Sequence, residues 1–349
     1  MKSIYPIEEC ESIPRKRPAD LHEIKVCSIA SALRRSFNFP IEKCYIDILR
    51  IFRNVPVKML YYERHVQLKV VKIGFVKVGN IGSAPLLEFL LDERAERQDI
   101  DVRVVSSGAK MTTEVAVEIA QKMLEFKPDF AVVTSPNASL PGPTKARETL
   151  KNAGVPTVVV SDSPAKKAVK QMEEAGFGYI IVEADAMIGA RREFLDPIEM
   201  ALFNVDIMRV LAATGAFSIL YNELDKIIEA TKRGESPQLP RVTIDRERAL
   251  ASAGYQNPYA RAKAYAAYEM ARRVADLTVE GCFIVKEWER YTQIVAAAHE
   301  MMRSAARMAD EAREIEKGPD QILRTPHYDD GTVLTKRKLI EKPKKPSET

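Results

Sequence analysis

Residues 71–82 read VKIGFVKVGNIG, and the amphipathic segment LLEFLLDERAER follows at 86–97. An apolar strand that runs into a glycine turn and then into a helix is the usual opening of an α/β domain that binds a nucleotide-like ligand. The turn reads G-x-x-G, with Gly79 and Gly82, and lacks the G-x-G-x-x-G spacing of dinucleotide-binding domains. The stretch predicts a strand–turn–helix unit whose glycines could serve either a ligand or only the tight turn.

The second predicted strand ends in VRVVSSGAK, at residues 102–110. Ser106 and Ser107 stand where an NAD-dependent enzyme would carry an Asp or Glu for the ribose hydroxyls. This pattern favours a phosphate-bearing cofactor and disfavours ordinary NAD.

Short apolar runs alternate with helical patterns between residues 71 and 182. The alternation predicts a buried, Rossmann-like parallel sheet with right-handed crossovers and helices on both faces. The predicted strands are 71–78, 102–106, 129–133, 156–160 and 179–182, and the predicted helices are 83–97, 112–126, 143–153 and 164–175.

After residue 190 the pattern becomes mainly helical. Asp196-Pro197 and Asn257-Pro258 each place an N-cap residue before a proline at the first helical position, and a third long helix is predicted over 290–316. The fold class is therefore α/β, a parallel sheet followed by a helical bundle region and a small β segment. Further short strands are predicted at 241–244, 281–285 and 333–340, and the predicted regions are 71–190 (α/β, cofactor-binding), 191–316 (helical) and 317–349 (β segment and tail).

Residues 1–70 form a leader that lacks a clear period. The leader has 13 Lys and Arg against 8 Asp and Glu, whereas residues 71–349 have 40 against 41. Glu63-Arg64 can be encoded by a purine-rich stretch that resembles a ribosome-binding site. The leader is therefore either a small accessory segment or the result of a wrongly assigned start, with the true start near Val70. We expect most of the leader to be absent or disordered in the working protein; an intact mass of 39.2 kDa from the native gene would contradict this.

The composition excludes several classes of protein. No apolar run approaches the roughly 18 residues that span a bilayer, and the N-terminus lacks the apolar core of a secretory signal. The near-neutral body gives no reason to expect nucleic-acid binding. Cys282 is the single cysteine after residue 70, so a reducing cytoplasm is expected.

Small and hydroxylated residues recur where the predicted strands end. Ligands of parallel α/β sheets bind at the carboxyl ends of the strands, so these residues predict a rim that binds a phosphate or a pterin. The loop SPNASLPGP at 135–143 contains three prolines and a glycine, which makes it a stiff ligand loop or a rigid connector. Asp162 and Asp185 follow the fourth and fifth strands.

The run DAMIGARREFLDP at 185–197 combines a carboxylate at a strand end with an Arg-Arg-Glu cluster. Such a cluster could bind a polar heterocycle with an anionic tail, or could form a hinge with an internal salt bridge. His299 is followed by Glu300-Met301-Met302 and so makes no HExxH zinc pair; a structural role is the alternative. Since no GxSxG elbow or Walker GK[ST] sequence is present, hydrolase and kinase functions are not indicated.

Several stretches taken together resemble the coenzyme F420-dependent methylenetetrahydromethanopterin dehydrogenases. They are VKVGNIG, LLDERAER, PDFAVVTSPNASLPGPTKARE, EADAMIGARREFLDPIEMALFNVDIMRVLAATGAF, NPYARAKAYAAYEMA, TVEGCF, YTQIVAAAHEMMRSAARMADEARE and RTPHYDDGTVLTKRK. The resemblance implies an archaeal enzyme that passes a hydride reversibly between methylenetetrahydromethanopterin and F420, in methanogenesis or its reverse. It also implies a homohexamer, a trimer of dimers, without metal or flavin.

The resemblance and the strand-end positions together give a set of expected roles. A carboxylate would favour the cationic methenyl product, so Asp185 is the first catalytic candidate and Glu193 the second. The residues expected to bind F420 are Lys77, Gly79, Asn80, Gly82, Ser107, Ser135, Pro136 and Asn137. Those expected to bind the pterin substrate are Pro141, Gly142, Asp162, Arg191, Arg192 and His299.

Two other functions fit parts of the pattern. One is an NAD(P)-linked pterin or small-molecule oxidoreductase, against which Ser106 and Ser107 argue. The other is a noncatalytic α/β protein that binds a ligand, because it too would have a pocket at the strand ends.

Overall fold

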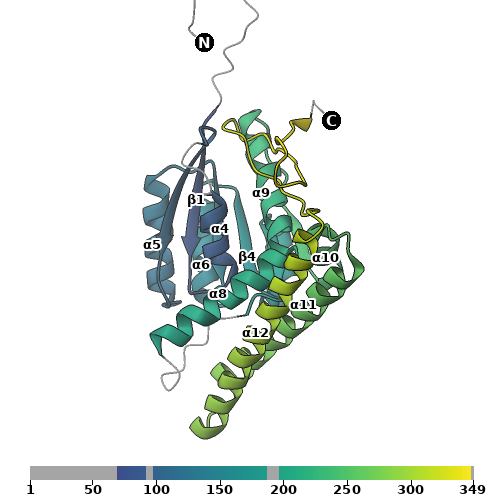
Figure 1. Ribbon diagram of the computed structural model, residues 1–349. Helices are drawn as coiled ribbons and strands as arrows, with labels where there is room; N and C mark the ends of the chain where they lie inside the picture. Colours follow the sequence, from purple (N-terminus) through teal and green to yellow (C-terminus); the bar gives the residue numbers. More distant parts are fainter. Residues whose placement is uncertain (1–68, 92–96, 187–195, 347–349) are drawn as a thin grey trace, which may run out of the picture. The chain divides into compact units, whose positions relative to one another are not determined.

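The computed structural model describes residues 69–91, 97–186 and 196–346 (Figure 1). The chain divides into two compact units, Met1–Gln67 and Leu68–Thr349, and all of the described residues belong to the second. The leader predicted at 1–70 therefore lies almost wholly outside the described residues.

Within the described residues, six parallel strands form one sheet in the order β2-β1-β3-β4-β5-β6. Val, Ile and Ala dominate the central strands, and β3, β4 and β5 are buried along their whole length, which requires cover on both faces. The strands are β1 Val71–Lys77, β2 Ile100–Ser106, β3 Phe130–Ser135, β4 Thr157–Asp162, β5 Gly178–Val182 and β6 Arg241–Ile244. The five strands predicted between 71 and 182 are confirmed in parallel pairing.

Alternate residues of the strands pack against different helices. Ile73, Phe75 and Val132 join a core with α4, α8, α9, α11 and α12, whereas Val76 and Val133 join a second core with α5 and α6. Figure 1 shows α5 and α4 on opposite sides of the strands. The helices are α4 Ser83–Leu91, α5 Thr113–Glu125, α6 Pro141–Asn152, α7 Val169–Glu174, α8 Pro197–Ala213, α9 Ala216–Lys232, α10 Arg246–Ala253, α11 Pro258–Val279 and α12 Trp288–Lys317.

Two predicted helix starts are confirmed by their caps. The Asp196 carboxylate accepts a hydrogen bond from the backbone N–H of Ile198 (2.8 Å), and the Asn257 side chain accepts one from Tyr259 (2.8 Å). Among the described residues no single helix is long and apolar enough to span a membrane; α8 and α9 pass only as a pair bent by 71°.

The strand predicted at 241–244 is confirmed, and it completes the sheet as β6, paired in parallel with β5. The sheet therefore extends into the region predicted as helical. The sequence pattern also missed α9 and α10, which flank β6.

The strand predicted at 281–285 is wrong. Residues Glu280–Ile284 instead form a π-helix, η4, between α11 and α12. The backbone N–H of Val285 donates to the Glu280 carbonyl (3.0 Å). A Cβ on Gly281 would lie 2.8 Å from Val295, so the glycine lets the two helices approach closely. A short apolar run between buried helices cannot be told from a strand by its pattern alone.

The strand predicted at 333–340 is not continuous. Within the described residues this segment makes isolated antiparallel bridges, in which Val333 pairs with His327, Thr335 with Lys344 and Lys336 with Arg324. Val333 and Lys336 pair with the same segment, 324–327, whereas Thr335 pairs with Lys344, so the segment makes separate bridges to two partners and not one continuous strand.

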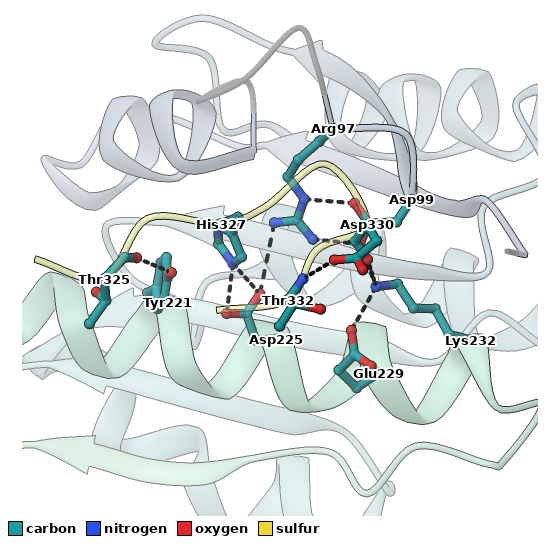
Figure 2. A network of polar contacts seen from close by, with 10 residues as sticks. All are labelled: Arg97, Asp99, Tyr221, Asp225, Glu229, Lys232, Thr325, His327, Asp330 and Thr332. Atoms are coloured by element: carbon teal, nitrogen blue, oxygen red, sulfur yellow. Dashed lines mark hydrogen bonds and ion pairs between the residues drawn. The ribbon is translucent and has the colours of Figure 1, made fainter. Parts of the chain in front are cut away.

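The tail after α12 is held to the body by a polar network (Figure 2). The Asp99 carboxylate, fully buried, accepts two hydrogen bonds of 2.8 Å from Arg97 and lies 2.6 Å from the Lys232 ammonium. Lys232 also donates to the Asp330 carbonyl (2.9 Å), and the tail residue His327 lies 2.9 Å from Asp225 of α9. These contacts join the start of β2, α9 and the tail.

Candidate functional site

The carboxyl ends of the strands meet along one edge of the sheet, as the register requires. Lys77 pairs with Ser106 and with Thr134, and Ser135 pairs with Ser161. Most of the residues predicted to bind ligands lie in the loops that follow these ends, so the structure brings them to one edge.

Asp185 lies after β5 and is fully buried. Its carboxylate accepts hydrogen bonds from the backbone N–H groups of Gly82 (2.7 Å) and Ser83 (3.0 Å), at the amino end of α4. Burial raises the pKa of Asp185 to about 6, against the hydrogen bonds from Ser83 and Gly82, which lower it. The predicted catalytic carboxylate is therefore hydrogen-bonded to the glycine turn at residues 79–82.

The glycines of this turn have different structural requirements. Gly79 has a φ of +84°, which side chains rarely adopt, and a Cβ there would lie 3.0 Å from Pro136. A Cβ on Gly82 would lie 2.1 Å from Ile207 of α8 and 2.9 Å from the Asp185 carboxylate. The space beside Gly82 is thus filled by α8 and Asp185, and the space beside Gly79 by Met111 and Pro136.

Lys77 and Ser107 hold the same turn from two other directions. The Lys77 ammonium lies 2.5 Å from Glu88 of α4. The Ser107 hydroxyl donates to the Lys110 carbonyl (2.6 Å) and accepts from the Gly79 N–H (3.3 Å). Both predicted cofactor residues therefore fix the shape of the turn.

The loop after β3 is folded by its own polar groups. The Asn137 side chain accepts from the N–H (3.0 Å) and the hydroxyl (2.6 Å) of Ser139. The Ser161 hydroxyl donates to the Ser135 carbonyl (2.6 Å) and accepts from the Ala138 N–H (3.1 Å). These hydrogen bonds add to the restriction that the prolines place on the loop.

Two hydroxyls at the end of β3 have unused hydrogen-bonding capacity. The side-chain oxygens of Thr134 and Ser135 are buried and have no hydrogen-bond partner among the described residues. Buried polar groups in native proteins are nearly always paired, so such atoms point to a ligand or to ordered water.

Asp162, at the end of β4, has the same property. One carboxylate oxygen accepts from the Ser163 N–H (2.5 Å), and the other is buried without a partner among the described residues. Burial, and next the charge of Asp185, raises the pKa of Asp162 well above its usual range, against the Ser163 hydrogen bond. The raised pKa favours the protonated acid of Asp162, which can donate a hydrogen bond.

Pro141 and Gly142 begin α6. A Cβ on Gly142 would lie 2.2 Å from the Met111 carbonyl oxygen, so the start of α6 packs directly on the backbone before α5. Pro141 is exposed.

The remaining predicted residues are not joined to this edge by the described contacts. Arg191, Arg192 and Glu193 lie outside the described residues. His299 of α12 is buried and stacks on Phe203 of α8, with ring centroids 3.9 Å apart. Burial lowers the pKa of His299 to about 4, so the ring is neutral at neutral pH.

The sequence pattern placed Thr134 and Ser161 at the predicted strand ends but assigned no binding role to them or to Ser83. Thr134 and Ser161 stand next to predicted residues at strand ends, and the recurrence of hydroxyls there was the available signal. Ser83 had no such signal, because its role depends on Asp185, 102 positions later in the chain.

The described cavities lie elsewhere. One of them, about 1280 Å³, runs along the amino ends of β4, β5 and β6 and the end of α9. It has no contact with the edge where Asp162 and Asp185 lie, so its size does not identify the site.

Comparisons with known proteins agree on one family. Residues 71–344 match the family model described as methylene-5,6,7,8-tetrahydromethanopterin dehydrogenase. The chain is 57% identical over 274 residues to the F420-dependent methylenetetrahydromethanopterin dehydrogenase of Archaeoglobus fulgidus, and 54% identical to that of Methanothermobacter marburgensis. Both matches cover 78% of this chain and 99% of the relative.

A solved structure gives the same result. It is an F420-dependent methylene-tetrahydromethanopterin dehydrogenase in complex with methylene-tetrahydromethanopterin and coenzyme F420. The likeness has a TM-score of 0.76 at 51% identity and covers 79% of this chain and all of the other.

Proposed function

This chain belongs to the methylenetetrahydromethanopterin dehydrogenase family, and from that premise we infer that it is the F420-dependent enzyme of archaeal one-carbon metabolism. It catalyses reversible hydride transfer from 5,10-methylenetetrahydromethanopterin to F420, giving the methenyl derivative and reduced F420. The observation that carries this conclusion is 57% identity over 99% of a relative of that activity. The resemblance read from the sequence motifs is thereby confirmed.

The described residues at the strand ends fit F420. The Thr134 and Ser135 hydroxyls are buried and unpartnered within the described chain, so they can bond to the carbonyl, ring nitrogen or phosphate oxygens of a deazaflavin. When bound, F420 supplies the acceptor for the hydride that leaves the one-carbon bridge. We assign its binding to Lys77, Gly79, Asn80, Gly82, Ser107, Ser135, Pro136 and Asn137, of which Gly82, Lys77 and Ser107 act by shaping the turn.

Loss of a hydride leaves the substrate as a delocalised methenyl cation. Negative charge near the one-carbon bridge favours that product, and positioning of the two reactants supplies the rest of the rate. In this proposal Asp185 contributes through the turn that it holds, with Glu193 as the second carboxylate. The substrate residues in the proposal remain Pro141, Gly142, Asp162, Arg191, Arg192 and His299; His299 fits a packing role on α8 at least as well.

We further propose the homohexameric assembly of the family, without metal or flavin, in the cytoplasm. Ile198, Leu202 and Val205 form an exposed apolar stripe at helical spacing on α8, and their burial between copies would stabilise an oligomer. In the described part of the chain, no group of three His, Cys, Asp or Glu side chains could hold a metal ion. Light scattering of Leu202→Glu tests the assembly: an oligomer unchanged in mass contradicts a role of this stripe.

The decisive experiment mixes the purified protein with oxidised F420 and methylenetetrahydromethanopterin and follows loss of the deazaflavin visible absorbance. We expect bleaching with F420, and no turnover when NAD or NADP replaces F420 as the acceptor. Turnover with NADP would instead favour the NAD(P)-linked alternative. Binding of both ligands without bleaching would favour a noncatalytic binding protein.

A further inference from the structure

Arg147 of α6 is a buried cation without a carboxylate partner. Its side chain is only 2% exposed, and among the described residues its guanidinium makes no ion pair. One N–H of the guanidinium donates to the Ala138 carbonyl (2.6 Å). The guanidinium carbon lies 5.7 Å from the centre of the Phe177 ring. Burial lowers the pKa of Arg147, and the nearby charge of Glu148 acts against this. Glu148 is itself paired with Lys145 (2.7 Å).

A second cation lies against the same ring. The Lys151 ammonium is 5.4 Å from the centre of the Phe177 ring and donates to the Ala175 carbonyl. Arg147 and Lys151 are four residues apart on α6, a spacing at which like charges repel each other on a helix. Two cations on one aromatic ring, one of them buried and neither in an ion pair among the described residues, form a site that an anion would stabilise.

A cavity lies at this position, between α6 and α7. Its volume is about 290 Å³, and it is lined by Arg147, Glu148, Lys151, Asn152, Gln171, Ala175 and Phe177. Asn152 and Gln171 add amide donors to the two cations. This volume is at the low end for small-molecule sites, which suits a compact anion better than a nucleotide or F420 itself.

We propose that this cavity binds a small oxyanion, of the phosphate or dicarboxylate class, between Arg147 and Lys151. Its occupant also steadies the loop after β3, because Arg147, which lines the cavity, donates to the Ala138 carbonyl of that loop. Ala138 lies next to Asn137, so the anion tightens F420 binding at a distance. This second effect rests on the proposed function; the anion site itself does not.

The anion site is tested by titrating inorganic phosphate, and separately succinate, into the full-length protein at constant ionic strength with potassium chloride as reference. Heat of binding and the thermal unfolding midpoint are both measured. We expect saturable binding of at least one of the two anions and a raised midpoint. In Arg147→Met binding should weaken by about tenfold or more, since a charge-assisted hydrogen bond is lost.

Two further variants keep the test decisive if Arg147→Met does not fold. Gln171→Glu places a carboxylate in the lining, so it should raise the midpoint without added anion and abolish the response to phosphate and succinate. Lys170→Met is the matched control, because its exposed side chain carries the same charge beside the cavity but does not line it. A response to both anions no larger than that to chloride, or an undiminished response in Gln171→Glu, overturns the proposal.

The coupling is read from quenching of F420 fluorescence with and without saturating phosphate or succinate. We expect about fivefold tighter F420 binding in the wild type and no change in Gln171→Glu. Unchanged F420 affinity, with the anion bound, overturns the effect on the loop and leaves the anion site standing. Failure to bind F420 at all would contradict the proposed function instead.

Discussion

At the residue scale, the two aspartates at the ends of β4 and β5 are the most informative side chains. Asp162 is the last residue of β4, and Asp185 lies shortly after β5. Both are buried, yet of the two only Asp185 has hydrogen-bond partners on both of its oxygens among the described residues. The difference separates their roles. Both oxygens of Asp185 accept hydrogen bonds from the turn, whereas Asp162 has an oxygen available to a ligand.

The raised pKa of Asp185 predicts how stability depends on pH. The folded pKa of about 6 lies above the ordinary value of 3.8, so the folded state favours the protonated acid. Its contribution is fully present below pH 4 and is lost as the pH rises through 6, a loss of about 3 kcal/mol. Urea unfolding at pH 4 and pH 7 should show this fall for the wild type relative to Asp185→Asn, which does not titrate. Parallel pH profiles for the two proteins would show that the pKa is not raised.

For Asp162 the prediction concerns binding of the substrate. As the pH rises through its raised pKa, the neutral acid becomes a carboxylate, which attracts the cationic methenyl compound. The KM for methenyltetrahydromethanopterin should therefore fall with rising pH, and Asp162→Asn should give a KM that does not follow this titration. Steady-state kinetics of both proteins across the pH range provide the measurement. A wild-type profile shared by Asp162→Asn would remove Asp162 from the substrate site.

At the element scale, the packing of α4 against α8 is fixed by one glycine. A Cβ on Gly82 would lie 2.1 Å from Ile207, so Gly82→Ala should lower the free energy of unfolding by about 1–3 kcal/mol. Gly318→Ala is the control, because a Cβ there has no atom closer than 3.6 Å. Urea midpoints measure both. If Gly82→Ala is as stable as the control, α8 does not press on the turn.

The polar network of the tail gives a second prediction for whole elements. Burial raises the pKa of Asp99, but the hydrogen bonds from Arg97 and Lys232 outweigh it and lower the pKa. Asp99→Asn removes the buried carboxylate that both cations share. It leaves Arg97 with Asp225 (3.9 Å) and Lys232 with Glu229 (2.6 Å), so the loss should be about 3 kcal/mol. The exposed Arg233–Glu235 pair serves as control, and Glu235→Gln should leave the midpoint unchanged. Equal effects of the two substitutions would show that the network does not fasten the tail.

The elements themselves were predictable to different degrees. The strands from 71 to 182 could be predicted because β-branched runs alternate with amphipathic helices, and β6 because RVTI is bounded by Pro240 and Asp245. The π-helix at Glu280–Ile284 could not, since its conformation depends on the approach of Val295 to Gly281. Local sequence carries the type of an element where the pattern is long, and tertiary packing decides it where the pattern is short.

The candidate site follows the same division. The strand-end rule located Ser135, Asp162 and Asp185 at one edge, because parallel register aligns the carboxyl ends. The contacts of these residues were not predictable, since Asp185 reaches the turn at Gly82 from 103 positions away. Arg147 gave no signal either, because a basic residue on an amphipathic helix is usually exposed.

At the scale of the whole molecule, the family match and the described fold both fall within the second compact unit. The family match covers residues 71–344, and the division between the units falls at residues 67 and 68. The two main cores of the described chain, and the network that fastens the tail, are built entirely from residues after 68. No described contact of the proposed site depends on the leader.

We therefore predict that a variant beginning with Met followed by Lys69 folds and turns over as the full chain does. Its thermal midpoint should match that of the full chain, because β1 begins at Val71 and, among the described residues, pairs with β2 and β3. The matched control begins at Gly74 and lacks the first three residues of β1, so it loses the buried Val71 and Ile73 and should unfold. Calorimetry and the F420 assay on the three proteins provide the measurement. A large loss of activity in the Lys69 variant, with its midpoint unchanged, would assign the leader a part in catalysis.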